Sequence, residues 1–185
     1  MGAFPFKKKK QSVGFRRRYD NPVGSGKYDV LLRPGYTALI GPDWCDKTKL
    51  LDQIRKAAAK DGWIVERIKD PIVKAGSADA ALNRIERLAG TAAKTGRPLL
   101  VAMEYPEGHA SVDLLMSFRE RIDEILRDGG IQPGGMDDPV YIVVATNAYA
   151  LCDCPCVDVR TGETLSFGTY QDFALRIVRD APVKV

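Results

Sequence analysis

The sequence predicts an α/β domain of three layers, with a mostly parallel central sheet between helices. Two continuous apolar runs, at 99–103 and 140–145, are typical of strands that are buried on both faces. A third apolar run ends at Gly41, and segments with helical periodicity lie between the runs. Strands that alternate with helices in this way favour a parallel sheet. The 185 residues suffice for one domain with a sizeable core.

The strands are marked by apolar runs that lie between turn-forming residues. The run at 28–32 is followed by Arg33, Pro34 and Gly35, which predict a turn before the next strand. Thr161 and Gly162 predict the turn of a hairpin near the end of the chain. In order, we expect strands at 28–32, 36–40, 63–68, 99–103, 140–145, 156–160 and 164–167.

The helices are marked by apolar residues that recur on one face. Leu50, Leu51, Ile54 and Ala58 share a face of the segment 47–60, and a glycine follows two residues after its end. Further helices are expected at about 77–94, 111–127 and 170–179. Each of the first three helices follows a predicted strand, as the alternating order requires.

The positive charge of the chain is concentrated near its amino terminus. The net charge is +4, and residues 7–10 and 16–18 supply seven positive charges before the first acidic residue. Without these seven, 21 of the 28 basic residues stand against 24 acidic ones. We therefore expect a basic arm over 1–26 and one folded domain over 27–185. With its interleaved aromatic residues, the segment 7–18 could bind nucleic acid, bind an acidic protein or remain solvated.

Two features bear on the cellular location. No apolar stretch approaches the length of a membrane span, and the amino-terminal segment lacks an apolar core after its lysines. We therefore expect a cytoplasmic location and no membrane partner.

Three of the four cysteines, Cys152, Cys154 and Cys156, lie within five residues of one another. On a strand their side chains would share one face, so a soft-metal or redox site is one interpretation. Buried free thiols in a reducing cytosol are the other interpretation, because the usual zinc spacing of two cysteine pairs is missing.

The segment 36–51 has the strand–loop–helix order of a phosphate-binding loop, whose pattern is G-x-x-x-x-G-K-[ST]. In such a loop, backbone N–H groups and a helix amino terminus point at phosphate oxygens. Lys47 would neutralise the outer phosphates, and Thr48 would offer its hydroxyl to magnesium. Asp46 replaces the second glycine; its carboxylate would repel a polyphosphate, and it is also a good N-cap residue. The candidate nucleotide-binding residues are Gly41, Pro42, Asp43, Trp44, Cys45, Asp46, Lys47 and Thr48.

Further motifs follow in an order that resembles the ABC/SMC-like class of P-loop ATPases, particularly small stand-alone members from bacterial and phage genomes. Glu104 follows four apolar residues, where the class has its Walker B aspartate. Glu107 stands where some small members keep a second acid, and Asn147 where most have the switch histidine. Residues 167–173 are similar to the closing segment of the class. The resemblance extends over 28–178 and implies a three-layer P-loop NTPase-like fold.

The resemblance also implies a role for each of these residues. ATP would be bound by 41–48, with Mg²⁺ on Thr48 and Glu104. Glu107 would polarise the attacking water, and Asn147 would contact the γ-phosphate side. Both Walker motifs, the switch and the glycines of the signature motif near Ser77 are altered, which indicates weak or absent hydrolysis.

Three functional hypotheses therefore remain open. The first is a nucleotide-binding pseudo-ATPase, and the second is a slow ATPase in which Glu107 orders the water. The third is a non-catalytic scaffold that uses its basic arm for nucleic acid or an acidic protein. A homodimer is compatible with the resemblance, but the short segment between Ile68 and Ser77 leaves no room for the helical subdomain through which larger members pair.

Overall fold

The computed structural model describes residues 14–42, 44–69, 77–104, 112–132, 138–146 and 154–165. The elements are β1 (Phe15–Asp20), β2 (Lys27–Leu32), β3 (Gly35–Ile40), α1 (Lys47–Lys60), β4 (Ile64–Lys69), α2 (Ser77–Thr95), β5 (Leu99–Glu104), α3 (Val112–Asp128), β6 (Val140–Ala145), β7 (Cys156–Asp158) and β8 (Thr164–Leu165). The expected strands and the first three expected helices are confirmed to within three residues at each described end. The helix expected at 170–179 lies outside the described residues.

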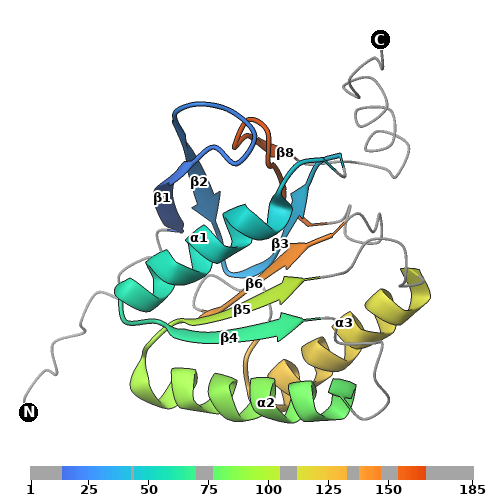
Figure 1. The fold of residues 1–185 in the computed structure, drawn as a ribbon. Helices are drawn as coiled ribbons and strands as arrows, with labels where there is room; N and C mark the ends of the chain where they lie inside the picture. The colour runs from blue at the N-terminus through green and yellow to red at the C-terminus, as the bar shows by residue number, and fades with distance from the viewer. Residues whose placement is uncertain are drawn as a thin grey trace, which may run out of the picture.

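A six-stranded sheet in the order β4-β5-β6-β3-β7-β8 forms the middle of the molecule (Figure 1). Neighbouring strands from β4 to β7 are parallel, and only β8 runs antiparallel, against β7. The fold is therefore α/β with a mostly parallel sheet, as the sequence predicts. One strand, β6, separates β3 from β5: Val143 pairs with Thr37 on one side and with Ala102 on the other.

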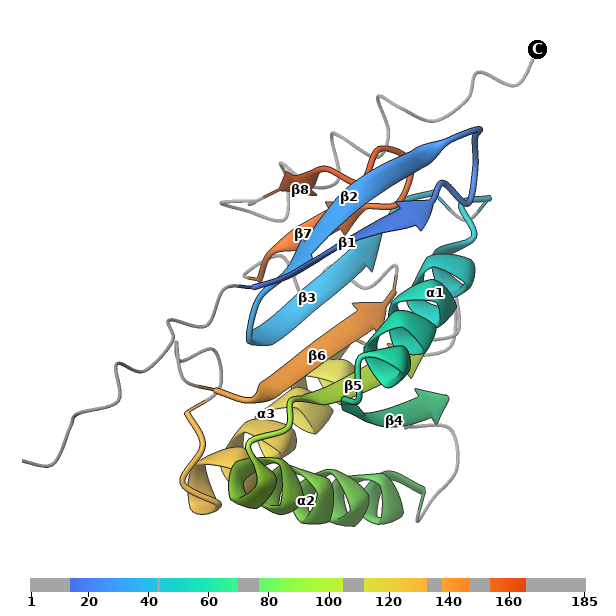
Figure 2. The same cartoon turned by 90° about the vertical axis from the view of Figure 1, so that its left-hand side faces the viewer.

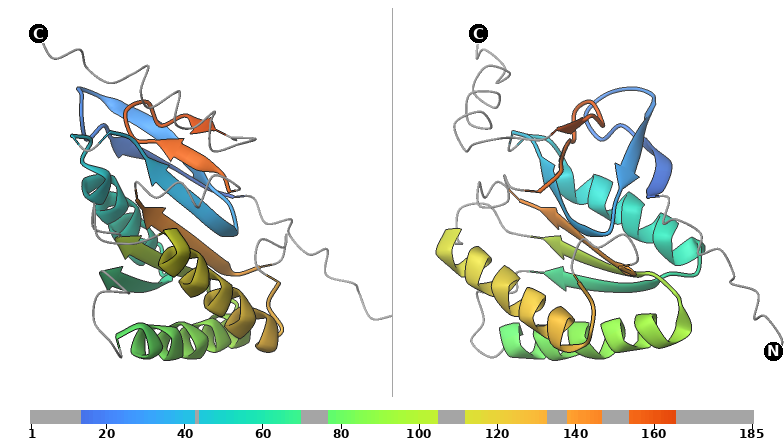
Figure 3. Two further views of the ribbon diagram at one scale, coloured as in Figure 1. Left: turned by 90° about the vertical axis from the view of Figure 1, so that its right-hand side faces the viewer. Right: turned by 180° about the vertical axis from the view of Figure 1, so that it is seen from behind.

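The helices cover both faces of this sheet, with α1 on one face and α2 and α3 on the other (Figures 2 and 3). The alternation of side chains along each strand explains the continuous apolar runs. In β5, Leu100 and Ala102 pack in the core under α1, whereas Leu99, Val101 and Met103 pack against α2 and α3. No helix in the described part of the chain has the length and apolar character needed to cross a membrane.

Strands β1 and β2 form a separate antiparallel hairpin on the α1 side of the sheet. Tyr19 is buried with residues of α1, and Asp20 exchanges two hydrogen bonds with the side chain of Gln53, of 2.8 and 3.0 Å. Within the segment expected as an arm, 1–26, residues 15–20 form β1. Three consecutive exposed arginines interrupt the alternation of apolar and polar residues, so the sequence pattern does not indicate a strand in which Tyr19 is buried. Residues 1–13 lie outside the described residues.

The β1–β2 hairpin also contacts the turn that joins β7 to β8. The Tyr28 hydroxyl donates to the carbonyl of Val159 over 2.8 Å. Gly162 lies in this turn with φ of 75°, and a Cβ atom added there would lie 2.2 Å from Cδ2 of the Tyr28 ring. Glycine is therefore required at this position both by the backbone conformation and by the aromatic ring above it.

We predict that Gly162→Ala destabilises the fold more than Gly26→Ala. Both glycines have positive φ, which costs an alanine about 1 to 2 kcal/mol. Only Gly162 faces an aromatic ring, since a Cβ at Gly26 would meet nothing within 4 Å. Overpacking adds about 1 to 3 kcal/mol. Urea unfolding measures both losses, and equal losses would contradict the contact between Tyr28 and Gly162.

Candidate functional site

The β3–α1 loop, residues 41–46, lies at the carboxyl edge of the parallel sheet. β3 ends at Ile40 and α1 begins at Lys47, as the sequence predicts. The connection after β3 lies on one face of the sheet, and the helices after β4 and β5 lie on the other. In open α/β sheets, ligands bind outside the carboxyl ends of the strands where the connections change faces. The position of the loop therefore fits a ligand site.

Lys47 lies inside this loop and is only 5% exposed. Its Nζ donates to the carbonyl oxygens of Gly41, at 3.2 Å, and Pro42, at 3.1 Å. A buried ammonium group is tolerated only with such partners, because its removal from water is costly. Gly41 has φ of 157°, and a Cβ there would lie 3.1 Å from Sγ of Cys45. The loop is thus closed around its lysine, and Gly41 permits the close approach of Cys45.

Asp46 is the N-cap residue of α1. Its Oδ1 accepts a hydrogen bond from the backbone N–H of Lys49 over 2.9 Å, and its φ is −76°. The left-handed conformation that the missing glycine would permit is therefore absent here. A carboxylate at this position interacts favourably with the helix dipole, but it occupies the end of the helix where a phosphate would bind.

Some backbone N–H groups of the loop and of the first turn of α1 donate to carbonyl groups within the loop, and others do not. The N–H of Cys45 donates to the carbonyl of Pro42 over 3.0 Å, and that of Lys47 to the carbonyl of Cys45 over 2.8 Å. Among the described residues, no backbone carbonyl accepts from the N–H groups of Asp46 and Thr48. Thr48 is exposed in the first turn of α1. A phosphate could therefore reach two donors at the start of the helix.

Glu104, the candidate magnesium ligand, is held by an arginine that the sequence analysis did not single out. The carboxylate oxygen Oε1 of Glu104 accepts from Nε of Arg67 over 2.8 Å and also from Nη2. Nη1 of the same guanidinium lies 3.7 Å from Oδ1 of Asp52 on α1. No group of three or more metal-binding side chains gathers in the described part of the chain. The described residues therefore do not fit a magnesium site at Glu104. The guanidinium of Arg67 occupies the carboxylate of Glu104 instead.

A second ion pair, between Asp158 and Arg160, lies beside the loop. These residues are far from the loop in the sequence and reach it because β7 pairs with β3. Asp158 ends β7 next to Ile40, and its carboxylate accepts from the backbone N–H of Arg160 at 2.9 Å, from Nε at 3.0 Å and from Nη2 at 2.7 Å. Both side chains are largely buried. Burial raises the pKa of the Cys45 thiol, while the charges of Lys47 and Arg160 lower it. The thiol of Cys45 is therefore influenced by charges from both the β3–α1 loop and the end of β7.

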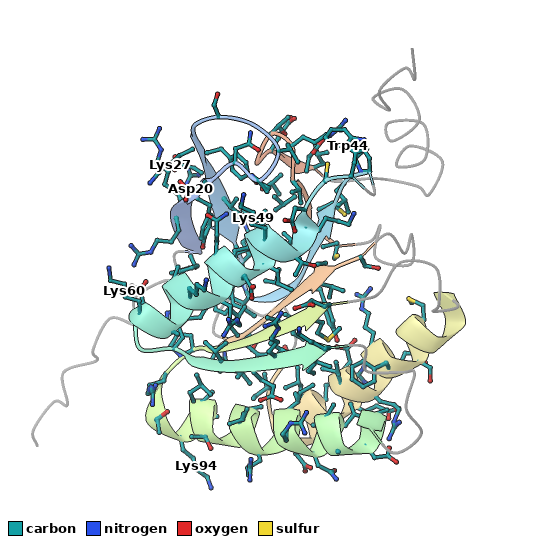
Figure 4. The ribbon with its side chains drawn as sticks, in the orientation of Figure 1. Asp20, Lys27, Trp44, Lys49, Lys60 and Lys94 are labelled. Carbon is teal, nitrogen blue, oxygen red and sulfur yellow. The ribbon has the colours of Figure 1, made fainter. Side chains whose placement is uncertain are left out.

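Among the described residues, Trp44 is the large hydrophobic residue that is exposed to solvent, with 53% of its surface accessible. It lies near the amino end of α1, whose first turn carries Lys49 (Figure 4). The other tryptophan, Trp63, packs between Phe15 and Tyr141, with ring centroids 4.5 and 4.6 Å apart. Trp44 is thus the tryptophan that a molecule at the loop would meet.

The other candidates from the sequence are placed as follows. Cys154 and Cys156 are buried on the α2–α3 side and form no disulfide, and Cys156 Sγ donates to the carbonyl of Cys154 over 3.3 Å. Cys152, Asp43, Glu107 and Asn147 lie outside the described residues. Of the basic run 16–18, Arg17 pairs with Asp61 and lies 5.4 Å from the Phe15 ring centroid. Binding of nucleic acid or an acidic protein through 7–18 stays a prediction.

Comparison with known proteins adds no family to this description. No protein-family model matches the sequence, and no curated protein matches it.

We predict that Asp46→Ala lowers the free energy of unfolding by about 0.5 to 2 kcal/mol, the usual value of an N-cap side chain. Asp46→Asn keeps an oxygen that accepts from the N–H of Lys49 and should cost less than about 0.5 kcal/mol. Urea unfolding compares the two variants. An Asp46→Ala variant as stable as the wild type would show that this cap does not support α1.

Proposed function

We propose that this protein binds a nucleotide, ATP in the first place, through residues 41–48 as a P-loop NTPase-like protein with weak or absent hydrolysis. The observation that carries the proposal is the buried ammonium group of Lys47. It lies inside the loop between a central strand and the amino terminus of α1, at the carboxyl edge of a parallel sheet. This is the position that the resemblance to ABC/SMC-like ATPases implies for the lysine of the motif.

Two contacts of Lys47 support phosphate binding because they can be exchanged. Its ammonium donates to two neutral carbonyl groups, of Gly41 and Pro42. A phosphate oxygen carries negative charge and accepts a stronger, charge-assisted hydrogen bond than a carbonyl does. The N–H groups of Asp46 and Thr48, which no described backbone carbonyl accepts from, would add two neutral donors. Binding would therefore replace contacts within the loop rather than require a new charged group.

Two features support weak or absent hydrolysis. The carboxylate of Asp46 at the start of α1 places negative charge near any bound phosphate, which disfavours further negative charge there. Glu104 is paired with Arg67, so the carboxylate expected to bind magnesium is already used. Phosphoryl transfer depends on positioning and electrostatic stabilisation, and both are compromised by these contacts.

We predict that Lys47→Met weakens ATP binding by about 10- to 100-fold, which corresponds to about 1.4 to 2.8 kcal/mol for one charge-assisted contact. Methionine keeps most of the buried apolar stem and removes the charge. Lys49→Met is the matched control, since Lys49 is exposed in the first turn of the same helix. This variant should bind ATP within about 3-fold of the wild type.

Isothermal titration calorimetry measures these affinities, and the fluorescence of Trp44 gives a second signal. Trp63 contributes a constant background because it is packed between two aromatic rings. A wild-type protein that binds neither ATP nor ADP at millimolar concentration would exclude the proposed function. Equal losses in the two lysine variants would show that the charge of α1, and not the loop, attracts the nucleotide.

We predict that the wild type releases inorganic phosphate from ATP no faster than Lys47→Met does. The physical reason is the pairing of Glu104 with Arg67 and the negative charge of Asp46 at the helix end. A phosphate-release assay with and without Mg²⁺ makes the comparison. Turnover in the wild type that disappears in Glu107→Gln would instead support the slow ATPase.

A further inference from the structure

We infer that the guanidinium of Arg67 takes the place of a divalent cation at Glu104, so that the site holds phosphates as free anions without Mg²⁺. The class of ligand, a nucleoside polyphosphate or pyrophosphate, rests on the proposed function. The position of Arg67 rests on the structure alone.

The geometry places Arg67 between the sheet and α1. Residues Lys69 and Glu104 pair in register at the ends of β4 and β5, so Arg67 lies two residues earlier on the neighbouring strand. From there it donates to Glu104 through Nε and Nη2 and reaches Asp52 through Nη1. Asp52 is four residues after Thr48 and therefore lies on the same face of α1. The guanidinium thus connects the two elements from which magnesium ligands were expected.

Electrostatics opposes a second cation at this place. The side chains of Arg67 and Glu104 are 30% and 19% exposed, so solvent screens their charges only in part. Magnesium binds oxygen at about 2.1 Å in strict octahedral geometry. An ion on the carboxylate of Glu104 would lie a few ångströms from a guanidinium that stays protonated at every accessible pH. The ion would have to displace Arg67 and leave its charge without an acidic partner at Glu104.

The same contacts have a consequence for the ligand. Magnesium normally accompanies ATP and offsets part of its charge. Here Lys47 supplies a fixed positive charge at the edge of the sheet, while the charge of Arg67 is balanced by Glu104. A fixed charge is present at any magnesium concentration. The affinity for the polyphosphate should therefore depend little on Mg²⁺, in contrast to a site in which the metal is shared between protein and nucleotide.

The direct test is a titration of the full-length protein with Mn²⁺ alone, followed by the electron paramagnetic resonance signal of the free ion. We expect no binding to the wild type at millimolar Mn²⁺ and at least 10-fold tighter binding to Arg67→Met. The gain should disappear in Arg67→Met/Glu104→Gln. Arg67→Gln keeps a hydrogen-bond donor without the charge and serves as a second variant if Arg67→Met does not fold.

The matched control is Arg84→Met. Arg84 donates to Glu66 on the same strand β4 over 2.7 Å, but away from Glu104, and its removal should leave Mn²⁺ binding unchanged. Wild-type protein that binds Mn²⁺ and loses it on Glu104→Gln would overturn the inference. So would folded Arg67 variants that bind no more Mn²⁺ than the wild type.

A second titration compares ATP affinity in Mg²⁺ and in excess EDTA. The two affinities should agree within about 3-fold for the wild type, since the metal contributes little, and Mg²⁺ should strengthen binding to Arg67→Met by at least 10-fold. An ATP affinity of the wild type that collapses in EDTA would overturn the inference. A complete lack of ATP binding would defeat the proposed function, while the Mn²⁺ titration would still decide the role of Arg67.

Discussion

The arrangement of this molecule depends on the burial of β3 in the middle of its sheet. All six residues of β3 are buried, and its backbone pairs with β6 on one side and β7 on the other. Because water does not reach such a strand, its N–H and C=O groups need partners within the protein. The chain can leave this pairing only at the end of the sheet. The loop, Lys47 and the start of α1 therefore lie at the carboxyl edge.

The basic side chains at this edge have different kinds of partner, which affects how a bound anion or cation would interact with them. Two contacts of Lys47 are with the carbonyl groups of Gly41 and Pro42, whereas Arg67 and Arg160 pair with the carboxylates of Glu104 and Asp158. In the proposed nucleotide complex, a phosphate would replace these two carbonyl contacts with a stronger, charge-assisted one. An incoming metal ion would have to break an ion pair that is partly shielded from water, which is costly. These contacts therefore support the proposal of a phosphate ligand that is bound without a metal ion.

The β1–β2 hairpin links the amino-terminal part of the chain to this edge. Tyr28 packs over the β7–β8 turn, and the side chain of Asn21 donates to the carbonyl of Arg160 over 3.2 Å. Residues that look like part of a basic arm thus help to position the segment that carries Asp158 and Arg160. The exposed arginines of β1 stand on a folded surface, where Arg17 is already paired with Asp61.

The sequence by itself determined the fold class, the order of most strands and helices, and the start of α1 at Lys47. These features follow from local patterns, because burial on one or two faces leaves a fixed periodicity in the residues of each element. The capping role of Asp46 was also visible, since a cap depends on neighbouring residues. Only the tertiary structure decided that Arg67 pairs with Glu104. It also decided that the segment with three exposed arginines forms a strand, β1, that pairs with β2. Such contacts join residues whose separation along the chain carries no periodic signal, and they arise only when the strands align in the sheet.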